Sequence, residues 1–89
     1  MLTASERKAL KAKAHKLEPV VQIGAKGLTD DVVAEIERAL KAHELIKVRA
    51  AGLERDLRDQ VLASICEKTR ADAVQQVGKV FVLYRKNDE

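Results

Sequence analysis

Aromatic residues are scarce in this chain of 89 residues, which contains one phenylalanine, one tyrosine and no tryptophan. Aliphatic side chains must therefore form most of the core, and hydrophobic residues make up 46% of the sequence. A chain of this length forms one compact domain, close to the lower limit for folding without disulfides or metals. We accordingly predict a single domain that spans residues 1–89.

Cysteine and long apolar runs are also lacking. With one cysteine, Cys66, the chain cannot form an intramolecular disulfide, which fits a reducing compartment. No apolar run approaches the length of a membrane span, and the first residues turn charged without the apolar stretch of a signal peptide. We therefore expect a cytoplasmic protein that does not associate with a membrane, with a monomer as the default state.

Residues that could carry enzyme chemistry are few. His15 and His43 are the only histidines, and neither forms a cluster of metal-ligand spacing with Cys66 or a carboxylate. His43 falls near the apolar stripe of an expected helix, where a packed side chain is the simpler interpretation. Cys66 lies at the border of another apolar stripe, which favours a structural thiol. We predict no cofactor, no metal and no enzymatic activity.

Charge is distributed unevenly along the chain, whose formal net charge is +3. Residues 1–28 contain six basic and two acidic side chains, a net charge of +4, whereas residues 29–46 contain two basic and five acidic ones, a net charge of −3. A basic N-terminal third attached to a near-neutral remainder indicates one surface that suits a polyanion.

The first half of the chain predicts two helices and a strand. Thr3 and Glu6 form a capping-box pattern at the start of a helix over about residues 4–17, and Pro19 closes it. A β-branched run over residues 20–23 predicts a strand, and a second helix opens at residues 28–31 with Thr29 as its N-cap. The residues expected to face the core are Leu10, Ala14 and Leu17 in the first helix and Val32, Val33, Ile36, Ala39 and Leu40 in the second.

The second half predicts a strand, a helix and a hairpin. Residues 45–50 alternate between apolar and basic side chains, as in a strand with one face in water. A helix over about residues 54–69 follows the turn at Gly52, with an inward face made of Leu57, Val61, Leu62 and Ile65. Residues 73–77 and 80–85 flank Gly78-Lys79 as a hairpin.

These elements give the order α-β-α-β-α-β-β. Strands joined through helices prefer parallel neighbours, and the closing hairpin adds an antiparallel pair. The fold class predicted is therefore α+β, a two-layer α/β sandwich with a four-stranded mixed sheet. Because one strand shows a polar side, we expect the helices to cover one face of the sheet only.

The loop Gly24-Ala25-Lys26-Gly27 stands between a strand and a helix. Its two glycines allow a phosphate to approach the backbone, the helix start directs N–H groups towards the loop, and Lys26 adds a charge. Taken alone, these four residues are more simply a tight strand-to-helix turn. The loop is not a Walker A motif, because Leu28-Thr29 follows its second glycine, and it lacks the third glycine of a dinucleotide-binding fingerprint.

Basic side chains cluster on one flank of the first helix. They are Lys8, Lys11 and His15, with Lys13 and Lys16 at the edges. Such a cluster is commonly a solvated helix face, but most of these lysines lack an acidic partner one turn away, which favours a nearby anion. Lys47 and Arg49 extend this surface if the open face of the sheet lies beside it, and an ordinary polar strand face is an equal alternative.

Three separated segments form a recognisable pattern, namely residues 17–29 (LEPVVQIGAKGLT), 42–48 (AHELIKV) and 78–85 (GKVFVLYR). Together they resemble the bacterial YhbY family of stand-alone CRM (chloroplast RNA splicing and ribosome maturation) domains. The resemblance covers essentially the whole chain. It implies a fold similar to the C-terminal domain of translation initiation factor three and a GxxG loop analogous to that of KH domains, although a KH loop joins two helices.

The resemblance also implies a function, namely RNA binding in association with ribosomal particles and precursors of the large subunit. Carried onto this sequence, it places RNA contacts at the loop and the adjacent basic helix. With few aromatic rings for base stacking, contacts should go mostly to phosphate and sugar. The RNA-binding residues that we predict are Gly24, Ala25, Lys26, Gly27, Thr29, Lys8, Lys11, His15, Lys16, Lys47 and Arg49.

One alternative assigns the chain to another functional class. A protein-docking module would reach the ribosome through a protein partner, using the acidic second helix. It would bind naked RNA no better than a neutral control protein does, yet it would still sediment with ribosomal subunits.

Overall fold

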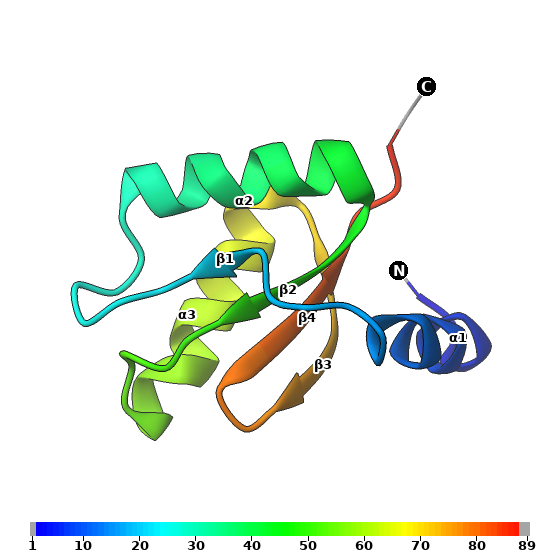
Figure 1. The fold of residues 1–89 in the computed structure, drawn as a ribbon, viewed down its shortest axis with the longest axis horizontal. Coiled ribbons are helices and arrows are strands. Elements are labelled where there is room, and N and C mark those ends of the chain that lie inside the picture. Colours follow the sequence, from blue (N-terminus) through cyan, green and yellow to red (C-terminus); the bar gives the residue numbers. More distant parts are fainter. Residues whose placement is uncertain (1, 88–89) are drawn as a thin grey trace.

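Seven helices and strands follow one another in a computed structural model that describes residues 2–87 (Figure 1). Their order is the one expected from the sequence. The elements are α1 (Ala4–Ala14), β1 (Val21–Gln22), α2 (Asp30–His43), β2 (Leu45–Arg49), α3 (Arg55–Thr69), β3 (Asp72–Val77) and β4 (Val80–Tyr84).

The four strands form one mixed sheet in the order β1-β2-β4-β3. β1 runs parallel to β2, with Val21 opposite Val48, and the other two pairings are antiparallel. The register of β3 against β4 shifts between Ala73 and Gln75, so β3 carries a bulge-like irregularity. The α+β class and the four-stranded mixed sheet are confirmed.

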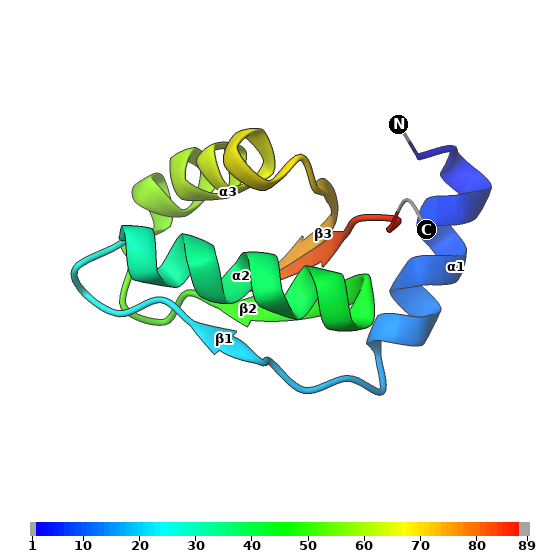
Figure 2. The same ribbon diagram turned by 90° about the horizontal axis from the view of Figure 1, so that it is seen from above.

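The main core lies between the sheet and the helices α2 and α3. The strands contribute Ile46, Val48, Phe81 and Leu83, which lie on one face because side chains two residues apart along a strand point the same way. Ile36 and Leu40 of α2 and Ile65 of α3 are completely buried against them. Figure 2 shows α2 and α3 on the same side of the sheet.

α1 packs on the opposite face of the sheet, so the expectation that helices cover only one face is wrong. Ala14 is buried with Val74 and Val82, and Leu10 packs against this second cluster. The guanidinium of Arg7 donates to the backbone carbonyls of Ala73 and Val74, which fastens the helix to β3. A stripe such as Leu10-Ala14 predicts burial, but it does not say against which face.

The ends of the helices differ in part from the sequence-based expectations. The capping box of α1 is confirmed, since Thr3 Oγ1 accepts from the Glu6 backbone N–H at 3.1 Å and Glu6 Oε1 accepts from Thr3 N–H. α1 ends at Ala14, three residues before the predicted end, and Leu17 is 38% exposed. α3 begins after Glu54, which makes no side-chain capping bond.

Two inward placements predicted from the sequence are also wrong. Leu57 lies 45% exposed near the start of α3, where the helix extends beyond the sheet core. The side chain of His43 is exposed at the end of α2 and is not packed in the core. Among residues 2–87, no helix combines the length and apolarity needed to cross a membrane.

We predict that Leu40→Ala destabilises the fold by roughly 2–5 kcal/mol, because it removes a fully buried side chain and leaves a cavity. Leu57→Ala makes the same chemical change at an exposed position and should alter the free energy of unfolding by at most about 0.5 kcal/mol. Urea unfolding followed by circular dichroism measures both. Equal losses in the two variants would contradict the assignment of the core.

Candidate functional site

The Gly24–Gly27 loop closes as a turn at the end of β1. The backbone N–H of Gly27 donates to the carbonyl of Gly24 at 3.0 Å, and Gly27 adopts a φ of +76°, a conformation that glycine reaches without strain. The side chains of Ala25 and Lys26 are exposed. The loop is therefore open to solvent, as a ligand-binding turn must be.

A second turn, at Gly52, packs against the backbone of the loop. A Cβ atom added to Gly52 would lie 2.4 Å from the carbonyl carbon of Gly24 and 2.6 Å from the backbone nitrogen of Ala25. No side chain fits between backbones this close, so position 52 requires glycine. The sequence identified Gly52 only as a turn, because nothing in its spacing reveals contact with a loop 28 residues earlier.

Leu53 adds an apolar support beneath the same loop. Its side chain is 7% exposed, and its Cδ2 would lie 3.8 Å from a Cβ at Gly27. The turn at residues 51–53 thus fixes both glycines of the loop, through backbone packing at one end and an apolar side chain at the other.

The start of α2 offers less positive potential than the sequence suggests. Thr29 Oγ1 already accepts from the Val32 backbone N–H at 3.3 Å, and the Thr29 carbonyl accepts from Val33. Asp30 and Asp31 occupy the first turn and offset the positive end of the helix dipole. Lys26 is the only cation between residues 24 and 31, so the loop needs further positive charge from neighbouring elements.

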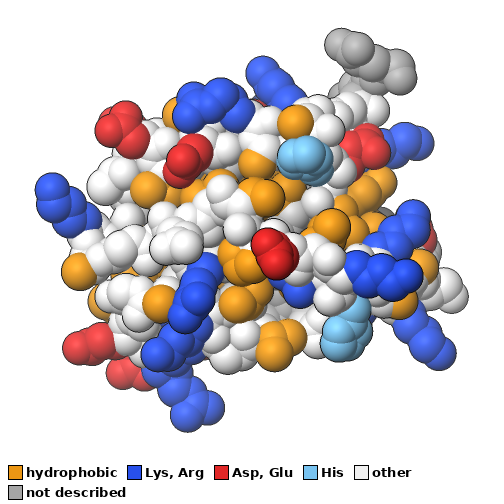
Figure 3. Space-filling view, in the orientation of Figure 1, with side chains coloured by type: hydrophobic (Ala, Val, Ile, Leu, Met, Phe, Trp, Pro, Cys, Tyr) orange, Lys and Arg blue, Asp and Glu red, His pale blue; other side chains and the backbone are white. Residues whose placement is uncertain are grey.

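The basic helix does not lie next to the loop. In Figures 1 and 2, α1 and the loop that joins β1 to α2 lie at opposite ends of the molecule, whose longest extent is 33 Å. In Figure 3, Lys and Arg side chains gather over α1 and towards the end of β2, and others lie over α2 at the top of the view. The two predicted RNA-binding regions, the loop and the basic helix, thus lie apart.

β2 connects these regions along the face of the sheet opposite α2 and α3. Lys47 lines one groove together with Lys11 of α1 and the C-cap residue His15. Arg49 follows on the same face of β2, roughly 7 Å further along the strand. Its carbonyl accepts from the Ile23 N–H at 2.7 Å, directly before the loop. We call the succession Lys11, His15, Lys47, Arg49 and Lys26 the basic strip.

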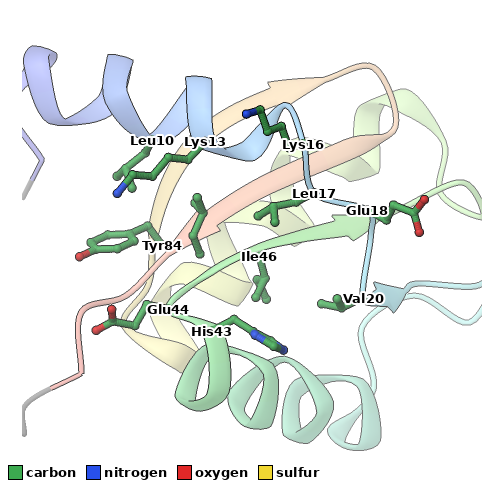
Figure 4. Close-up of a pocket in the computed structure, with 11 residues that line it drawn as sticks. Leu10, Lys13, Lys16, Leu17, Glu18, Val20, His43, Glu44, Ile46 and Tyr84 are labelled. Atoms are coloured by element: carbon green, nitrogen blue, oxygen red, sulfur yellow. The ribbon is translucent and has the colours of Figure 1, made fainter.

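The remaining predicted cations lie outside this strip. Lys8 is exposed on α1, and Lys16 lines a different cleft together with Lys13. Figure 4 shows that cleft, of about 640 Å³, between α1 and the end of α2, with Leu17, Val20 and Ile46 towards its interior. Its rim carries both signs of charge, because Glu18 and Glu44 accompany the lysines.

Comparison with known proteins identifies the family. Residues 2–85 match the model of the CRS1/YhbY (CRM) domain. The chain belongs to this family. The resemblance seen in the three sequence segments is therefore confirmed, and the match extends over nearly the whole CRM domain described above.

Several known proteins are similar to this chain over most of its length. A protein of Haemophilus influenzae named "RNA-binding protein" is 46% identical over 99% of this chain and 89% of its own length. A "Probable RNA-binding protein" of Pseudomonas aeruginosa is 48% identical over 97% of this chain and 83% of its own. The solution structure of a hypothetical Staphylococcus aureus protein superposes with a TM-score of 0.87 at 32% identity, covering all of this chain and 93% of the other.

The two sites considered for enzyme chemistry are separate in this CRM domain. Cys66 packs at the edge of the main core, where burial, with a smaller contribution from Asp72, raises the pKa of its thiol. His15 lies on the other side of the sheet, as the C-cap of α1. Among residues 2–87, no three His, Cys, Asp or Glu side chains gather as metal ligands would.

We predict that Gly52→Ala displaces the Gly24–Gly27 loop and destabilises the domain by roughly 1–3 kcal/mol, the usual effect of overpacking. Gly24→Ala is the matched control, because a Cβ at position 24 would meet nothing within 4 Å. Thermal unfolding and amide chemical shifts of residues 24–28 measure both effects. An unchanged loop in Gly52→Ala would contradict the backbone contact.

We predict that Cys66 reacts slowly with iodoacetamide at pH 8, because a raised pKa lowers the fraction of reactive thiolate. Asp72→Asn removes a negative charge and should accelerate the reaction, provided that the free energy of unfolding stays unchanged.

The raised pKa of Cys66 also means that the folded state keeps its thiol proton at a pH where the unfolded chain loses it. The thiol's contribution to stability is therefore present below the unfolded pKa and declines as the pH rises through the folded one. If Cys66 of the native protein reacts with iodoacetamide as fast as it does in urea, the raised pKa is contradicted.

Proposed function

We propose that this CRM protein binds RNA through the basic strip. The observation that carries the proposal is the groove where Lys11, His15 and Lys47 converge from two elements, with no acidic side chain among the described residues that line it. Arg49 continues this positive surface towards the loop. Both the family match and the relatives named as RNA-binding proteins support the same ligand.

The strip suits the phosphate backbone of RNA. Lys and Arg side chains spaced along a strand neutralise successive phosphates, and their contribution does not depend on base sequence. The glycine loop adds a place where a phosphate can approach the main chain, with Lys26 beside it. Because Asp30 and Asp31 follow, this end of the site binds phosphate chiefly through shape, together with Lys26 and Arg49.

We further propose that the RNA is ribosomal RNA in precursors of the large subunit. The protein binds it in the cytoplasm, as a monomer and without catalysis. The resemblance to stand-alone CRM domains supports the particle, and the small basic surface supports a role in binding rather than in chemistry. Crosslinking in cells followed by sequencing of the attached RNA tests it. Enrichment of other RNA classes over large-subunit RNA would reject it.

A second candidate is a protein-docking role for α2. Asp30, Asp31 and Glu35 are exposed along this helix, far from the basic cluster of α1. A basic ribosomal protein could bind there. This candidate requires that Asp31→Lys with Glu35→Lys abolishes sedimentation with ribosomal subunits, while binding to naked RNA does not decrease.

We predict that Lys47→Glu weakens binding to a structured large-subunit RNA fragment by at least about ten-fold at 0.1 M salt, with Lys26→Glu weakening it less. The loss of one phosphate contact should also lower the slope of log K against log salt by roughly 0.7–0.9. Filter binding across a salt series provides both values.

The control is Lys68→Glu, which makes the same charge change at an exposed position of α3, on the other side of the sheet. It should reduce affinity far less than Lys47→Glu does. Equal losses in Lys47→Glu and Lys68→Glu would show that net charge, and not the basic strip, determines binding.

A further inference from the structure

The groove beside Lys47 contains more apolar surface than phosphate binding requires. It has a volume of about 320 Å³, and its floor includes Val77, Val80 and Val82. Val77 is 55% exposed and lies opposite Val80 in the β3–β4 hairpin. Pro19 closes one side. Open apolar surface of this kind gains nothing from a phosphate, which loses hydration when it is placed against it.

The rim of the same groove is entirely basic or neutral. Lys11 approaches from α1, His15 from the C-cap of this helix and Lys47 from β2. Gln75 of β3 contributes an amide that can both donate and accept hydrogen bonds. The cleft shown in Figure 4 is different, because its rim mixes carboxylates with lysines. The groove at Lys47 combines an apolar floor, an anion-binding rim and a neutral polar group.

This combination matches one unpaired nucleotide. A base offers flat apolar faces and a polar edge, while the phosphates on either side of it carry the negative charge. In a continuous duplex the bases are stacked inside, so a duplex presents phosphates and sugars but cannot occupy the valine floor. An unpaired or bulged base can.

We propose that this groove holds the base of one unpaired nucleotide. The base lies on Val77 and Val80, its edge meets Gln75, and its flanking phosphates contact Lys11 and Lys47. The protein consequently prefers RNA with a bulge or a single-stranded junction to a continuous duplex. This inference rests on the proposed RNA-binding function and names the feature of the RNA that is recognised.

The test uses two RNA hairpins with the same number of phosphates, one fully paired and one with a single bulged 2-aminopurine. The wild-type protein should bind the bulged hairpin about ten-fold more tightly. The fluorescence of the 2-aminopurine should rise on binding, because the base leaves its stacked neighbours for an aliphatic site.

Two matched variants distinguish the contribution of the apolar floor from a general effect of added negative charge. Val77→Glu places a carboxylate on the floor and should reduce the ratio of the two affinities to about one. Val20→Glu makes the same change at a valine of similar exposure, 51%, in the other cleft, and should retain the ratio. Gln75→Leu should keep the preference for a bulge but reduce discrimination among the four bulged bases.

The outcomes distinguish the inference from the function on which it rests. Equal binding of both hairpins by the wild-type protein overturns the inference and leaves RNA binding intact. Binding of neither hairpin overturns both. Equal binding together with a dimer in sedimentation that only Val77→Glu dissociates would mean that a second copy of the chain covers the floor, and it also overturns the inference.

Discussion

The short parallel pairing of β1 with β2 is the constraint on which the candidate site depends. Parallel strands end at the same edge of a sheet, so the loop after β1 and the turn after β2 must meet there. That meeting brings Gly52 against the backbone of Gly24 and places Arg49 beside the loop. Two strand residues in β1 thus determine the position of the whole glycine turn.

The position of α1 determines the rest of the surface. Leu10 and Ala14 bury themselves on the face of the sheet opposite α2, and Arg7 is occupied with carbonyls of β3. Because α1 is short, it leaves part of that face open. Lys47 and the valines of the hairpin lie at this opening, so the helix forms one wall of the groove rather than a lid over it.

The charged groups are distributed differently at the two ends of the basic strip. At the helix start after the loop, Thr29 occupies one N–H group and two aspartates offset the positive end of the dipole, whereas no acidic side chain lines the groove at Lys47 among the described residues. The loop supplies close backbone approach, and α1 with β2 supplies most of the charge. In the proposed site, this distribution lets a domain with a net charge of only +3 offer a surface to a polyanion.

The sequence by itself determined the order of elements, the α+β class, the buried side of β2 and the family, because hydrophobic period, capping residues and glycine turns are local signals. It also placed Lys47 and Arg49 on the face of β2 opposite the core, where Arg49 is exposed and Lys47 is half-buried beside α1. Only the tertiary structure decided that α1 covers the second sheet face, that α1 and the loop lie apart, and that Gly52 supports the loop. The predicted burial of Leu57 and His43 is wrong for the same reason. An apolar stripe shows that a helix has a buried side. Which element covers that side, and along how much of the helix, depends on chain segments remote in sequence.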